Sequence, residues 1–471
     1  MLQDLMRKKT HNSSKSHRAL PWATAIVMAL NGCASWSPAS PLVPAQTSTT
    51  APAENSLSQW WQRFNDPLLG QLVTQALQAN TSVRSAQAAL QQSRALRDVK
   101  SASLLPGVSA SGSAGRSKSG GNDTSNSFQV GLDASWEPDI FGGNRSALNA
   151  TEADAKASEA SLADVQVSIA AEVALAYIQL RGLQTQLSIA RSNLTSQQET
   201  LQLTDWRAQA GLITSLEVEQ ARTATEQTSA QIPTLDVSIA KTQHSLAVLT
   251  GQRPDALLVL LNTAQPVPQA AGDLAQSIPA QTLRQRPDVR AAEHRISAAL
   301  ARVSVADAAR YPSFSLSGSL GLSALTLGTL TNAAAVGNSL LAGITIPVFD
   351  GGAAKMQVLA QEAALEQARA SYQAVVLTAL TDVEDALVAL QGDREKQVHL
   401  QSAATAAGNA ALLAQQRYST GLIDFQTVLQ TQRALLTTQD SVASNTADIS
   451  ADHVRLYKAL GGGWNSTSNQ E

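Results

Sequence analysis

The chain has 471 residues with a formal net charge of −3, and only 4% of them are aromatic and 15% charged. This balance offers no basic surface for a nucleic acid, and so few aromatic residues are not typical of a conventional enzyme core. One cysteine excludes a disulfide within the chain, and the six histidines lack the spacing of metal ligands, so we expect no cofactor, no metal and no catalytic site.

The N-terminus has the pattern of an export signal. Five basic residues and one acid, Asp4, precede an apolar run over residues 19–30, which predicts a signal peptide over residues 1–32. Residues 30–33 read Leu-Asn-Gly-Cys, similar to the bacterial lipobox. We predict a lipid anchor at Cys33, the alternative being a plain signal peptide with an incidental cysteine. Ala34 in place of an aspartate implies passage to the outer membrane.

A tether and two helices follow. Residues 33–56 are rich in Pro, Ser, Thr and Ala without periodicity, which predicts that the lipidated cysteine begins a disordered tether. Asp66 and Pro67 are start signals for a short helix to about Asn80, and a second helix is expected from Thr81 to about Ser101.

The next segment changes to a period of two. Apolar residues alternate with polar ones over 128–137 and 313–322, and further candidates lie at about 105–115 and 339–348. Four such strands are typical of a membrane barrel, although a soluble antiparallel sheet with one wet face has the same period. In a bilayer, the two open edges would leave backbone groups unpaired at several kcal/mol each. The chain would therefore oligomerise, and three copies would give twelve strands with room for a pore.

Glycines mark the passage from strand to helix. They permit the backbone to turn without the steric cost of a Cβ atom. A phosphate-binding glycine loop is the alternative, but neither a following lysine nor the GxGxxG spacing is present. The predicted turns contain Gly142, Gly143, Gly351 and Gly352.

A long helix is predicted from Gly143 to about Gln202, a rod of roughly 90 Å. Its apolar positions step by 3, 4, 4, 3 and 4 residues, which matches the 3.6-residue period, and the same steps recur 210 residues later (372 − 162). The two sets are Leu162, Val165, Ile169, Val173, Ala176 and Leu180, and Tyr372, Val375, Ala379, Val383, Ala386 and Leu390.

This repetition predicts two copies of one structural unit. We place the first repeat at 57–251, a linker at 252–282, the second repeat at 283–462 and a C-terminal tail at 463–471.

Carboxylates such as Asp382 and Asp385 are expected on a solvated helix face.

Both rods end in similar turns, at residues 207–215 and 417–425, and helices return from each. Gly211 and Gly421 suit the left-handed position that ends a helix. Thr214 and its counterpart Asp424 both suit a helix N-cap. In a three-fold assembly, Asp424 would also form a ring of three carboxylates.

Several motifs together carry a family resemblance. The chain resembles the TolC-type outer membrane efflux family, and most closely its OprM- or NodT-like lipoprotein branch, from Cys33 to Trp464. Besides the lipobox, the motifs are WWQRFNDPLLGQLVTQAL from Trp60, LRQRPDVRAAEHRI from Leu283, ARYPSFSLSGSLG from Ala309, ITIPVFDGG from Ile344 and VRLYKALGGGW ending at Trp464.

The resemblance implies a fold and a function. The fold is a membrane β-barrel joined to a long α-helical barrel, in which a homotrimer completes twelve strands and the helices form a hollow periplasmic cylinder closed at its tip. Small Ala and Ser with Gln, Asn and Thr suit such a hollow wall. The function is an outer membrane exit duct that passively carries drugs or other small amphipathic molecules from an inner-membrane pump and a periplasmic adaptor.

The resemblance also places the adaptor contact and the gate at the tip. Its residues are Gly211, Leu212, Ile213, Tyr418, Gly421, Leu422, Ile423 and Asp424. We expect Leu212, Leu422 and Ile423 to be exposed as partner contacts, whereas simple tight hairpins are the alternative. Two other functions stay open: a duct for type I protein secretion, and a periplasmic scaffold lipoprotein, against which the four strands and two rods argue.

Overall fold

The computed structural model describes residues 57–118, 120, 124–271 and 282–463. The predicted signal peptide, the lipid anchor at Cys33 and the tether lie outside these residues, so they stay predictions.

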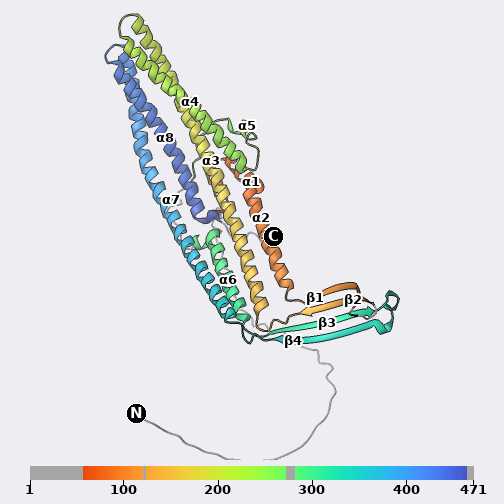
Figure 1. Ribbon diagram of the computed structural model, residues 1–471. Helices are drawn as coiled ribbons and strands as arrows, with labels where there is room; N and C mark the ends of the chain where they lie inside the picture. The colour runs from red at the N-terminus through yellow and green to blue at the C-terminus, as the bar shows by residue number, and fades with distance from the viewer. Residues whose placement is uncertain (1–56, 119, 121–123, 272–281, 464–471) are drawn as a thin grey trace, which may run out of the picture. The chain divides into compact units, whose positions relative to one another are not determined.

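The described elements form two series, and each series contains, in the same order, a helix, two strands, a long helix and a returning helix (Figure 1). The first contains a 3-10 helix η1 (Leu57–Phe64), α1 (Pro67–Ala79), α2 (Thr81–Ala102), β1 (Gly107–Ser117), β2 (Ser125–Trp136), α3 (Gly143–Gln209), α4 (Ser215–Leu249) and the short α5 (Leu258–Leu261). The second contains η2 (Thr282–Gln285), α6 (Pro287–Ala308), β3 (Ser313–Ala324), η3 (Leu327–Thr329), η4 (Ala333–Ala335), β4 (Val336–Thr345), α7 (Ala353–Ser419), α8 (Phe425–Ala459) and η5 (Gly461–Gly463).

The long helices are confirmed, and matching elements of the two series have equal lengths. Both α3 and α7 have 67 residues, which is about 100 Å of helix. Both α4 and α8 have 35 residues, and both α2 and α6 have 22. The short η1 and α5 were not predicted, because neither is long enough to show a period.

The predicted start of α1 at Asp66 and Pro67 is confirmed, and α2 has a cap that was not predicted. The carboxylate of Asp66 accepts from the backbone N–H groups of Leu68 and Leu69, at 2.9 and 3.0 Å, and Pro67 occupies the first helical position. Asn80 then caps α2 by accepting from Ser82 N at 2.8 Å, and its amide donates to Leu249 O at 2.8 Å. One residue thus begins α2 and also satisfies the end of α4.

The main apolar core lies where α1 and the neighbouring parts of α3 and α8 meet. Trp60 stacks on Tyr457, with ring centroids 5.3 Å apart, and both are about 1% exposed. Elsewhere the apolar residues that α3 buries are all alanine, and Gly182 allows close packing because an added Cβ would lie 3.0 Å from Ala447 Cβ. Small residues therefore set the spacing of these helices.

Toward the turns, the seam between α3 and α8 becomes polar. Asn193 Nδ2 donates to Gln439 Oε1 at 2.8 Å, and Gln432 Nε2 donates to Thr200 Oγ1 at 2.9 Å. These side chains are largely buried, so the seam is held by hydrogen bonds rather than apolar contact. The sequence expectation of amides and hydroxyls in place of a bulky core is confirmed here.

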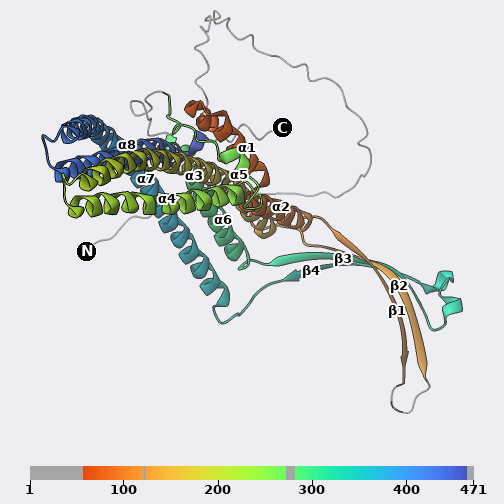
Figure 2. The ribbon, with the colours of Figure 1, turned by 90° about the horizontal axis from the view of Figure 1, so that it is seen from above.

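The four predicted strands form one antiparallel sheet in the order β1-β2-β3-β4, with β1 and β4 at its edges (Figure 2). Register pairs Ala110 with Leu132, Leu132 with Leu320, and Leu320 with Asn338. Because paired residues point to the same side, the apolar residues of β1, β2 and β3 share one face.

That apolar face is uncovered. Val108 is 69% exposed, Leu340 78% and Ile344 63%. The long helices do not cover these residues, which argues against the alternative of a soluble sheet whose apolar face packs on helices.

Candidate functional site: the hairpin turns and the strand-to-helix junction

The two hairpin turns have the same backbone geometry. Gly211 and Gly421 have φ of 72° and 79°, in the left-handed region, which confirms the predicted helix ends. Beyond each glycine, the N–H of Leu212 donates to Arg207 O and the N–H of Leu422 to Arg417 O, both at 2.9 Å. These six-to-one bonds define a Schellman end in both copies.

The helices that leave the turns are capped by different chemistry. Before α4, Glu217 accepts from the hydroxyl of Thr214 and from its N–H at 3.1 Å, and the bond from the hydroxyl is the main cause of the lowered pKa of Glu217. Before α8, Asp424 accepts from the Thr427 N–H at 2.8 Å and its hydroxyl at 2.6 Å. The hydroxyl and then the N–H hold the pKa of Asp424 below its usual value. The predicted caps are confirmed, and Asp424 is a charged cap.

One cation joins the two turns. Arg207 Nη1 donates to Tyr418 O at 2.6 Å, and its Cζ lies 4.6 Å from the centre of the Tyr418 ring. The ring of Tyr418 in turn lies 5.7 Å from that of Phe425. This Arg207–Tyr418 bridge connects the last turn of α3 to the last turn of α7. No sequence pattern reveals this bridge, because the two residues are 211 positions apart (418 − 207).

The structure corrects two of the predicted contact residues. Tyr418 is 3% exposed and belongs to a small core with Phe425 and Val428, so it cannot present its ring to a partner. Ile423 is only partly exposed because it packs against the same core. Leu212 and Leu422 are exposed as predicted, at 69% and 74%.

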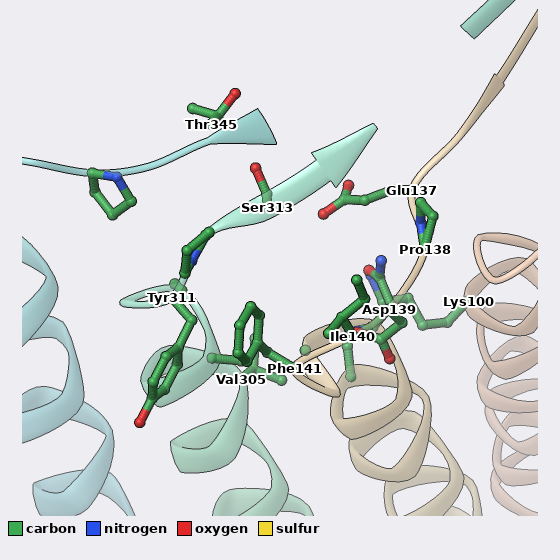
Figure 3. Close-up of a pocket in the computed structure, with 17 residues that line it drawn as sticks. Lys100, Glu137, Pro138, Asp139, Ile140, Phe141, Val305, Tyr311, Ser313 and Thr345 are labelled. Atoms are coloured by element: carbon green, nitrogen blue, oxygen red, sulfur yellow. The ribbon is translucent and has the colours of Figure 1, made fainter. Parts of the chain in front are cut away.

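The strand-to-helix junction contains a cavity of about 440 Å³ (Figure 3). Phe141 and Tyr311 stack beside it, with ring centroids 4.9 Å apart, and Lys100 and Glu137 contribute charges to its lining. Asp139, which also lines it, accepts from the backbone N–H groups of Asn144 and Arg145 at 3.1 and 2.7 Å.

The predicted glycine turns are present, with one correction. Gly142, Gly351 and Gly352 have φ of 75°, 64° and 88°. Gly143 instead begins α3, and its smallness serves packing because an added Cβ would lie 3.2 Å from Ala308 Cβ.

The phosphate-loop alternative does not fit this junction. Asp350 accepts from Gly352 N and Ala354 N, both at 2.8 Å, and these bonds lower its pKa. Asp139 fills the same role at α3. The first N–H groups of both long helices are therefore satisfied by the chain's own carboxylates, which would repel an anion.

The sequence also contains no sign that the guanidinium of Arg286 is buried. Arg286, 8% exposed, donates through Nη2 to Asp288 at 2.8 Å and to Asp382 at 3.0 Å, and through Nη1 to Ala459 O at 2.9 Å. Burial opposes its charge, but the two carboxylates raise the pKa of Arg286 overall. Asp382 lies on an exposed face of α7 as expected, and its bond to Arg286 also ties the start of α6 to α7.

Comparison with known families decides what these elements are. The family described as "Outer membrane efflux protein" matches residues 72–252 and 278–462, which include both long hairpins and all four strands. The chain belongs to this family.

Individual proteins similar to this efflux protein support the same family assignment. It is 34% identical over 427 residues to the pyoverdine export outer membrane protein OpmQ of Pseudomonas putida, covering 87% of this chain and 89% of that one. It is 32% identical to the toluene efflux pump outer membrane protein TtgI of Pseudomonas putida, covering 86% and 87%. The solved outer-membrane channel OprN superposes with a TM-score of 0.82 at 37% identity, covering 86% and 93%.

These matches establish the function at the level of the family. The protein is an outer membrane channel of a tripartite efflux system, with long helices on the periplasmic side. The alternative of a type I protein secretion duct is not favoured, because the relatives are export and efflux components.

Proposed function

We propose that three copies of this chain assemble into a single duct, in which twelve strands close a barrel and the long helices form a hollow periplasmic cylinder. The observation that carries the proposal is the sheet with two open edges, β1 and β4, and one uncovered apolar face. Unpaired edges in hydrocarbon cost several kcal/mol for each backbone group, and pairing β4 with β1 of the next copy removes them.

The cargo in this proposal is a small amphipathic molecule, such as a drug or a solvent. It passes from an inner-membrane pump through a periplasmic adaptor into the duct, which supplies no energy of its own. The names of OpmQ and TtgI, which refer to pyoverdine export and toluene efflux, support cargo of this size.

Adaptor contact and gating belong, in the same proposal, to the two hairpin turns. The exposed Leu212 and Leu422 supply apolar contacts, and Gly211 and Gly421 hold the turns tight. Asp424 adds a negative charge beside the second turn, so three copies would repel one another and a bound cation would favour the closed tip.

A lipid on Cys33 completes the proposal by attaching the N-terminus to the outer membrane. Cells labelled with radioactive palmitate should yield a labelled wild-type protein and an unlabelled Cys33→Ser variant. An unlabelled wild-type protein would remove the anchor and leave the duct unaffected.

The central test measures assembly and conduction together. Detergent-purified protein should have the mass of three chains by light scattering and give discrete conductance steps in a planar bilayer. A folded protein that stays a monomer and never conducts would overturn the proposal.

The tip is tested by Leu422→Glu, which places a charge at the exposed apolar position. Drug resistance should be lost while the amount of trimer stays normal, because the side chain is 74% exposed and supports no core. The matched control is Leu377→Glu, a similarly exposed leucine (64%) in the middle of α7. Equal effects of both variants would contradict a specific role for the turn.

A further inference from the structure

The polar face of the sheet is almost uniformly small. In β1 and β3 it consists of serine and glycine alone, and in β4 Leu341 is the one bulky apolar residue on it. Its residues are Gly107, Ser109, Ser111, Ser113, Gly115 and Ser117 in β1; Ser125, Ser127, Gln129, Gly131, Asp133 and Ser135 in β2; Ser313, Ser315, Ser317, Ser319, Gly321 and Ser323 in β3; and Gly337, Ser339, Leu341, Gly343 and Thr345 in β4.

One residue on this face is charged. Asp133 pairs with Ser109 on one side and with Ser319 on the other, and it is exposed. The Ser111 hydroxyl donates to Asp133 Oδ2 at 3.2 Å. The only other charge within the four strands as bounded here, Arg116, has the opposite parity in β1 and lies on the apolar face.

Within the four strands, the carboxylate of Asp133 is therefore the one charged group on the polar face. Hydroxyls and glycines neither attract nor repel ions strongly, and no cation on the strands faces Asp133. We propose that Asp133 makes the barrel lumen selective for cations, three copies forming a ring at one level. This inference rests on the proposed trimer, in which the apolar face meets lipid and the polar face lines the lumen.

The size of the ring follows from strand geometry. Twelve strands spaced about 4.8 Å apart and tilted by about 40° give a barrel radius of about 12 Å. A side chain reaching about 3 Å inward puts each carboxylate about 9 Å from the axis. That distance is comparable to the Debye length of about 10 Å at 0.1 M salt, so ionic strength decides how far the ring acts.

The expected effect is strong at low salt and absent at high salt. With an aqueous dielectric constant, three charges at about 9 Å raise the concentration of a monovalent cation on the axis about fivefold at 0.01 M, where the Debye length is about 30 Å. At 1 M, where it is about 3 Å, the same ring gives only about 1.1-fold. A selectivity from the narrower tip would be screened less, because its charges lie closer to the ion.

The experiment measures reversal potentials in planar bilayers under KCl gradients centred near 0.01 M and near 1 M. Asp133→Asn, which keeps the shape, should lose several-fold of the K⁺ over Cl⁻ preference at low salt and change nothing at 1 M. Asp133→Ser, which gives the position the residue that dominates this face, should behave in the same way. The matched control is Asp255→Asn, which removes another exposed carboxylate, one that pairs with Arg253 at 3.5 Å in the segment between α4 and α5.

The outcomes separate this inference from the function on which it rests. A wild-type protein that never conducts would overturn the trimeric duct. A conducting wild type whose low-salt selectivity is unchanged in both Asp133 variants would overturn the inference alone. The same holds if Asp255→Asn lowers the selectivity as much as Asp133→Asn does.

Discussion

The Arg207–Tyr418 bridge can be broken by one substitution, Arg207→Ala. A hydrogen bond from a charged donor contributes about 1.5–3 kcal/mol, and the low end applies because Arg207 is only partly buried. The cation over the Tyr418 ring adds about 0.5–1 kcal/mol at an exposed site. If the tip opens by separating the two turns, the loss of about 2 kcal/mol favours the open tip about 30-fold in each protomer.

The assay is the open probability of single channels in a planar bilayer, with trimer abundance measured in parallel. Arg417→Ala is the matched control, because Arg417 occupies the corresponding position before the second turn and its exposed side chain bonds to none of the described residues. Arg207→Lys keeps the charge but not the planar group, so its effect should be intermediate. Equal open probabilities for Arg207→Ala and Arg417→Ala, with assembly intact, would refute the argument.

Three further predictions concern stability and protonation. Gly421→Ala should destabilise the folded protein by about 1 kcal/mol, because the φ of Gly421 is 79°. Gly392→Ala should stabilise it by about 0.5–1 kcal/mol, because Gly392 lies in the interior of α7 with open space around it. Thermal unfolding measures both changes. Burial and then the bond to Asp66 raise the pKa of Tyr177 to about 12, so stability should fall as pH rises from about 10 through 12, and absorbance at 295 nm should show late ionisation. The pKa of Asp424 is lowered in the folded protein, so its cap stabilises α8 above the unfolded-state pKa, and this stabilisation is lost as pH falls through the folded-state pKa. Acid should therefore make the second turn sensitive to proteolysis in the wild type. Asp424→Asn should show no acid-dependent increase in proteolysis at this turn.

Periodicity was sufficient to predict the long helices and the four strands. The steps of α3 and α7 recur at a constant offset, and the alternation in β2 and β3 defines one apolar face, which the register confirms. These patterns show which face of an element is apolar, and they can be read from the local sequence alone.

Partners distant in the chain could not be predicted in this way. The bonds of Arg207 to Tyr418 and of Arg286 to Asp382 join residues that only the packing of the helices brings together. The burial of Tyr418 could not be predicted either, because its position near a turn says nothing of the small core to which it belongs. The capping roles of Asp139 and Asp350 were not predicted, because the glycines that follow within three residues are the stronger local signal.

The two hairpin turns have the same backbone conformation but differ in one capping residue, Thr214 in the first and Asp424 in the second. Since a hydroxyl and a carboxylate both satisfy a helix N-terminus, exchanging them leaves the turn intact. In a duplicated chain, the N-cap of one repeat can therefore gain or lose a negative charge while the N-cap of the other repeat stays unchanged. Electrostatics at the tip can diverge between related proteins without any change in architecture.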